Sequence, residues 1–191
     1  MKNLNTTTLV VISLIALHPA AAESSKVATD AVCEQLNNQA VGAMNAHKWR
    51  NAIARLNEAL KLNPTYSHSR ENLIMSHNQY GSELEEQHKY REALSEYHQA
   101  LNLGPSKRFD ATRTNAETLN HVNNAIRLLG KNPNDFRDRV ALGDQARAAN
   151  DLAGALAEYQ AALELKNDPV IHTKIADLCR LMGKKERAAA Q

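Results

Sequence analysis

The sequence predicts an all-α protein, an α-solenoid of stacked helix–turn–helix repeats, and three observations lead to this fold class. Residues that favour helices are plentiful, whereas runs of β-branched residues are scarce beyond the first 16 positions. One amphipathic segment recurs three times along the chain. A second helical pattern and a short break precede each copy. Because one short helix pair cannot bury its own apolar face, such repeats are expected to stack on one another.

The recurring segment carries its apolar residues in one helical stripe. It reads NAIARLNEALKLNP at 51–64, REALSEYHQALNLGP at 91–105 and AGALAEYQAALELKN at 153–167. A small residue is followed four positions later by a large one and then by an Ala-Leu pair, which places all of them on one face of a helix. The stripe consists of Ala52, Leu56, Ala59 and Leu60; Ala93, Tyr97, Ala100 and Leu101; and Ala155, Tyr159, Ala162 and Leu163.

A short break separates each of these helices from the helical pattern before it. The breaks cover 46–49, 87–90 and 149–152. The preceding helices contain small residues, among them Gly81 and Gly143, which would let two helices approach closely.

Together these features resemble the tetratricopeptide-repeat (TPR) family, whose unit spans about 34 residues. The large residue expected near the start of the first helix is a weak match, since Leu36, His77 and Arg139 occupy that place. The other matching positions are Ala40, Trp49, Ala52, Leu56, Ala59 and Pro64; Gly81, Tyr90, Ala93, Tyr97, Ala100 and Pro105; and Gly143, Leu152, Ala155, Tyr159 and Ala162, with Asn167 in place of proline. The resemblance implies a right-handed solenoid.

The resemblance also implies a concave groove, lined by the first helix of each repeat, that receives an extended peptide or a partner helix. The amides and the serine hydroxyl at these positions could bond a peptide backbone, the methionines could adapt to apolar side chains, and the arginines could bind a carboxylate. The expected partner-binding residues are Asn37, Val41, Met44, Met75, Asn78, Ser82, Glu85, Arg137, Asp144 and Arg147, with Glu34 and Val140 on the same face.

The repeats are unevenly spaced, which sets the expected domain organisation. Pro64 and Pro105 lie further apart than one repeat, by about two helical turns, so 66–86 is expected to form a long first helix. Pro105 and Pro133 lie closer together than one repeat. The interval 106–135, whose helix is expected at 109–129, is either a degenerate repeat or a spacer. The expected units are a signal peptide at 1–22, repeats at 23–105 (about 31–64 and 66–105), this interval, and a repeat with a partial or capping repeat at 136–191.

Residues 1–22 are typical of a secretory signal peptide. Lys2 precedes an apolar run at 9–17, and small residues at 20–22 form a cleavage site. The alternative, a membrane anchor, would need about 20 apolar residues, more than this run supplies. The protein is therefore expected to be exported, to the periplasm or the medium, with no stable membrane insertion after cleavage.

Composition and motifs indicate a binding protein without catalytic, metal or cofactor sites. A net charge of +2 and 4 % aromatic residues give no reason to expect a nucleic-acid partner. No nucleophile motif, phosphate-binding loop or paired metal-ligating histidines occur. The histidines of the mature chain are expected to be solvated or capping: His47, His68, His77, His88, His98, His121 and His172. Cys33 and Cys179 are expected to be semi-buried thiols too far apart to pair, with an intermolecular bridge as the alternative.

The sequence therefore predicts an extracytoplasmic scaffold or adaptor that binds a protein or peptide partner. The alternative is an accessory or assembly subunit of a larger cell-envelope enzyme or secretion complex. Neither prediction specifies an oligomeric state.

Overall fold

The computed structural model of the chain describes residues 19–104 and 111–189, and its regular structure in those ranges is entirely helical. The predicted all-α class is confirmed. The predicted leader at 1–22 lies outside the described residues except for its last four positions, which begin the first helix. The helices are α1 (Pro19–Asn45), α2 (Trp49–Leu62), α3 (Ser67–Glu86), α4 (Tyr90–Asn102), α5 (Ala111–Leu128), α6 (Phe136–Ala148), α7 (Leu152–Leu165) and α8 (Pro169–Ala189).

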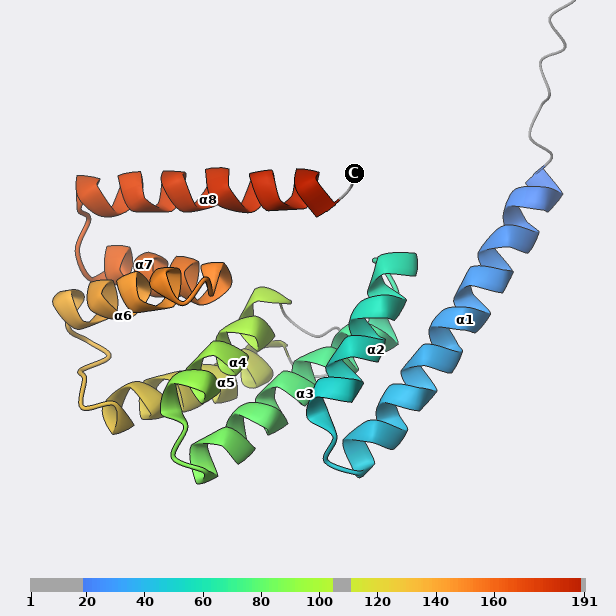
Figure 1. Cartoon of the computed structure of the whole chain (residues 1–191), viewed down its shortest axis with the longest axis horizontal. Helices are drawn as coiled ribbons and strands as arrows, with labels where there is room; N and C mark the ends of the chain where they lie inside the picture. The colour runs from blue at the N-terminus through green and yellow to red at the C-terminus, as the bar shows by residue number, and fades with distance from the viewer. Residues whose placement is uncertain (1–18, 105–110, 190–191) are drawn as a thin grey trace, which may run out of the picture.

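Helices that are neighbours in the chain are mostly neighbours in space (Figure 1). The closest associations are the pairs α1–α2, α3–α4 and α6–α7. The helix α4 also packs against α5 and, across a gap in the sequence, against α7. The apolar core follows this order, because it consists of separate clusters along the row of helices and not of one central cluster.

The three close pairs are joined by the same turn. The second residue after the end of the first helix adopts positive φ in each pair, at His47 (54°), His88 (58°) and Asn150 (63°). The N–H of the following residue donates to a carbonyl in the last turn of the helix, at 2.8 to 2.9 Å. This Schellman arrangement satisfies carbonyls that would otherwise lack a partner. The breaks predicted from the sequence therefore lie where the structure reverses direction.

The predicted stripe forms the core between the paired helices. Its Ala positions and its large residues Leu56, Tyr97 and Tyr159 are almost fully buried. The predicted close approach is also present: a Cβ added to Gly81 would lie 2.6 Å from Cε1 of Tyr97, and one added to Gly143 would lie 2.5 Å from Cε1 of Tyr159. A methyl group at either position would therefore overlap an aromatic ring unless the ring moved.

The helix α5 has no second helix of its own. It ends in the same kind of turn, with Gly130 at a φ of 72° and Lys131 N–H bonded to the Ile126 carbonyl at 3.1 Å. After this turn the chain continues through Asn132–Asp135 to α6. The apolar residues of α5, including Val122 and Ile126, join the core of α3 and α4.

Two expectations about single residues need correction. The expected semi-buried character holds for neither cysteine, since Cys33 is fully buried and Cys179 is exposed. Both are free thiols. Burial raises the pKa of the Cys33 thiol, and the nearby Asp30 carboxylate adds to this effect.

Among the described residues, no helix combines the length and apolar character that crossing a bilayer requires.

Candidate functional site

The ten expected partner-binding residues lie on α1, α3 and α6. Met75, Arg137, Asp144 and Arg147 are exposed, and the other six are half-buried. Of these six, Met44 packs against the apolar cluster around Ala40. The related position Val140 similarly packs against the cluster around Tyr159.

Two of the expected amides join neighbouring first helices to each other. The Asn72 amide donates to Oδ1 of Asn37 at 2.8 Å, which links α3 to α1. Asn78 and Thr118 exchange hydrogen bonds of 3.1 and 3.2 Å, which link α3 to α5. Both side chains therefore contribute to the packing of the array.

Two of the expected acids hold buried tyrosines. The Tyr97 hydroxyl donates to Oε2 of Glu85 at 3.0 Å, and the Tyr159 hydroxyl donates to Oδ1 of Asp144 at 2.6 Å. Burial, followed by the adjacent carboxylate, raises the pKa of both tyrosines. Lys174 of α8 also binds Asp144. The two carboxylates therefore fix the rings that pack on Gly81 and Gly143.

In two of the helix pairs, a contact between a basic side chain and a carboxylate joins the two helices at equivalent positions. His77 lies four residues before Gly81 and its Nδ1 is 2.7 Å from Oε2 of Glu96. Arg139 lies four residues before Gly143 and its Nη1 is 3.0 Å from Oε2 of Glu158. At these two positions the sequence resembles the TPR pattern only weakly, because a charged or titratable residue stands where that pattern has a large one.

The second of these pairs belongs to a buried cluster where α4, α5, α6 and α7 meet. The Arg139 guanidinium also donates to the Pro133 carbonyl at 2.8 Å and to Asn123 at 2.9 Å. The second oxygen of Glu158 lies 3.0 Å from Nε2 of His98. Glu158 is only 1 % exposed and His98 only 3 %. The expectation that all histidines are solvated or capping is therefore wrong for His77 and His98, which face carboxylates inside the protein.

Opposing effects determine the protonation of Glu158. Burial by itself would raise its pKa, because it removes the carboxylate from water. The contacts with His98 and Arg139 outweigh burial and hold the pKa of Glu158 below its ordinary value. Glu158 is therefore an anion at neutral pH, and the cluster contains a buried negative charge that needs its partners.

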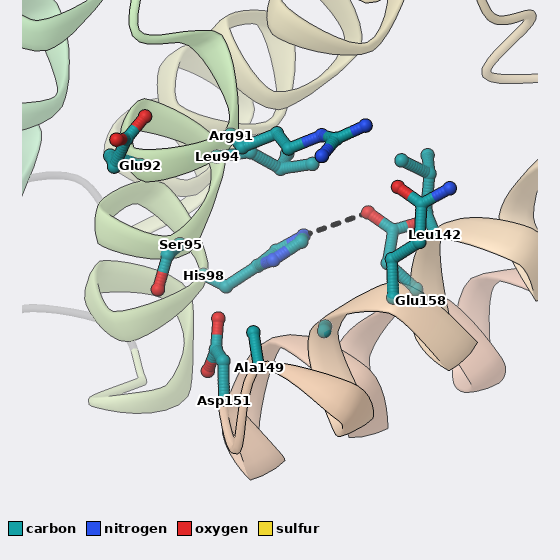
Figure 2. Close-up of a pocket in the computed structure, with 11 residues that line it drawn as sticks. Arg91, Glu92, Leu94, Ser95, His98, Leu142, Ala149, Asp151 and Glu158 are labelled. Atoms are coloured by element: carbon teal, nitrogen blue, oxygen red, sulfur yellow. Dashed lines mark ion pairs between the residues drawn. The ribbon is translucent and has the colours of Figure 1, made fainter.

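A cavity of about 320 Å³ adjoins this cluster. Figure 2 shows the His98 imidazole reaching from α4 across this space toward the Glu158 carboxylate. The lining residues are Arg91, Glu92, Leu94, Ser95, His98, Leu142, Gln145, Ala146, Ala149, Asp151 and Glu158. None of the ten expected partner-binding residues lines this cavity. The structure thus offers a polar face on the first helices and a separate pocket between α4 and the α6–α7 pair.

Within the described part of the chain, no group of three or more His, Cys, Asp or Glu side chains is placed to hold a metal ion. No protein-family model matches the sequence, and no curated protein is similar enough to count as a relative.

Proposed function

We propose that this protein is an exported TPR array that serves as a scaffold for a protein or peptide partner. The repetition of one geometry in three helix pairs supports this proposal best. A residue with positive φ occupies the same position in the turn of each pair, and the same glycine–tyrosine contact lies between the helices of two of them. Repeats of this kind are built by stacking and present long surfaces suited to binding.

The partner would bind on the face of the first helices. Met75, which is 41 % exposed, supplies an adaptable apolar side chain on α3. Arg137 and Arg147 of α6 are exposed and could bind carboxylates. Because Asn37, Asn78, Glu85 and Asp144 are held by intramolecular bonds, we assign the direct contacts chiefly to these three side chains.

Site-specific crosslinking tests the proposed face. A photoreactive residue would replace Met75 or Arg147 in cells that export the protein, and a matched control would replace the exposed Glu164 of α7. We expect both first-helix positions, and not the control, to capture the same partner. Arg147→Glu should then weaken binding of that partner in calorimetry, by about 1 kcal/mol or less if the pair is solvated. Equal capture from Glu164 would place binding on another face.

Export is tested separately by the mass of the protein outside the cytoplasm. A species that lacks residues 1–22 supports a cleaved leader. A full-length chain in that fraction, with Met1 retained, would contradict it.

A further inference from the structure

The cavity between α4, α6 and α7 has apolar walls. Leu94 of α4 and Leu142 of α6 face it, together with Ala146 and Ala149 near the end of α6. These side chains could enclose a short aliphatic chain, because apolar surface removed from water stabilises a complex. The other lining residues are polar or charged.

The inner end of the cavity carries a buried hydrogen-bond acceptor, Oε1 of Glu158, that lacks a donor in the part of the chain that the structure describes. Oε2 of Glu158 accepts from Arg139, but Oε1 has no hydrogen-bond donor among the described residues. Nε2 of His98 is 3.0 Å from Oε1, but no hydrogen bond joins the two atoms. Buried polar atoms without a partner are rare in proteins and often mark a place where another group binds. A ligand that donates a hydrogen bond would satisfy Oε1.

The mouth favours a donor that is also a cation. Glu92 and Asp151 both line the cavity, and one oxygen of Asp151 is already used by the Gly154 N–H at the start of α7. Arg91 also lines the cavity and opposes a cation, but it forms no ion pair with a carboxylate in the described part of the chain. Glu92 and Asp151 outnumber this one base in the lining, so the local field attracts positive charge.

From these observations we infer that the cavity binds an aliphatic ammonium group, presented as a lysine side chain of a partner protein. The methylene groups lie along the leucines and alanines, and the ammonium donates to Oε1 of Glu158. The His98 imidazole now covers that oxygen, so the ring turns aside when the ligand enters. This inference names a chemical group for the proposed partner but concerns a different face, and its test does not require the partner.

The test is a nuclear magnetic resonance titration of the ¹⁵N-labelled protein with butylammonium chloride, and with butan-1-ol as the uncharged control. We expect butylammonium to shift the amide signals of residues around Ser95, His98 and Glu158, and to bind at least about tenfold more tightly than the alcohol, as expected for a hydrogen bond to a charged group. Equal binding of the two compounds would show an apolar pocket without cation preference and would overturn the inference. No shift, or shifts confined to other helices, would also overturn it.

Three variants sharpen the test. Glu158→Gln should lower the affinity for butylammonium by about tenfold or more. Glu92→Gln should lower it by about two- to threefold without disturbing the fold, because Glu92 is exposed. Glu164→Gln, on α7 but outside the cavity, is the matched control and should leave affinity unchanged. If Glu158→Gln does not fold, Ala149→Phe takes its place, because the larger side chain would close the mouth of the cavity and should abolish binding of butylammonium. Unchanged affinity for butylammonium in both Ala149→Phe and Glu92→Gln would refute the site.

A short peptide with one internal lysine distinguishes the two sources of the ligand. Binding of both peptide and butylammonium supports a lysine side chain. Binding of butylammonium alone would assign the cavity to a free amine and overturn the assignment to a protein partner. Because the scaffold proposal depends on crosslinks from Met75 and Arg147, failure here leaves that proposal intact.

Discussion

Gly143→Ala tests the packing of the repeats most directly, because a single methyl group would meet the Tyr159 ring. The added Cβ would lie 2.5 Å from Cε1 and 2.6 Å from Cδ1. Carbon atoms in favourable contact are about 3.5 Å apart or more, so the ring would have to move by about 1 Å. The ring is fully buried and its hydroxyl is bonded to Asp144 at 2.6 Å, which restricts that movement.

Two opposing effects set the expected magnitude. Overpacking of this kind costs about 1–3 kcal/mol. Alanine in a helix interior is favoured over glycine by about 1 kcal/mol. The net loss of unfolding free energy for Gly143→Ala is therefore about 0–2 kcal/mol. Gly42→Ala in α1 is the matched control, because nothing lies within 4 Å of its added Cβ and only the helix preference remains. The two variants should differ by about 1–3 kcal/mol.

Urea unfolding followed by far-ultraviolet circular dichroism measures both variants. A third measurement, Gly143→Ala in a Tyr159→Leu background, should show the stabilisation seen for Gly42→Ala, since the smaller side chain removes the overlap. If Gly143→Ala and Gly42→Ala changed stability equally, to within about 0.5 kcal/mol, the close contact between α6 and α7 would not exist.

Three other predictions concern the buried groups. Arg139→Ala should destabilise the protein by about 3–5 kcal/mol in urea unfolding, because it leaves the Glu158 charge buried without the guanidinium that pairs with it. The double variant Arg139→Met with Glu158→Leu should cost much less, because it removes both charges. Equal losses in the two variants would show that the buried charge is not the cause. The pKa of Glu158 is lower in the folded state than its ordinary value of 4.5. The stability that the Glu158 carboxylate contributes should therefore be complete above about pH 4.5 and should be lost as the pH falls below that value. Glu158→Gln should reduce this loss of stability in acid. A thiol reagent should label exposed Cys179 in the native protein and label Cys33 only after unfolding; rapid native labelling at both would contradict the burial of Cys33.

The sequence predicted the helices and their pairing well because the responsible signals are local. The stripe around Leu56, Tyr97 and Tyr159 repeats at helical spacing, and the breaks before α2, α4 and α7 have equivalent positions. The need for glycine at 81 and 143 also followed from the repeat pattern. All of these features involve residues within one helix pair, whose separation in the chain is fixed by the repeat.

The buried contacts around Asn78 and Glu158 were not predicted, because they join separate helix pairs. Nothing in the spacing of Asn78 and Thr118, or of His98 and Glu158, indicates that the side chains meet. The contact between α4 and α7 joins helices that are separated in the chain by α5 and α6, and it brings together residues from different helix pairs. One signal was available: a charged residue, Arg139, stood where the repeat expects a large core side chain.

The contact between α4 and α7 has a consequence for how the molecule opens. In a simple row of helices, each unit touches only its neighbours, so the ends can open independently of the middle. Here the direct contact between α4 and α7 connects residues on either side of α5, whereas α8 has its main contact with α7. In native-state hydrogen exchange, amides of α4 and α7 should therefore be released together, as one cooperative unit, whereas amides of α8 should exchange earlier and by themselves. A row of independent units would instead release α7 with α8, and leave α4 protected.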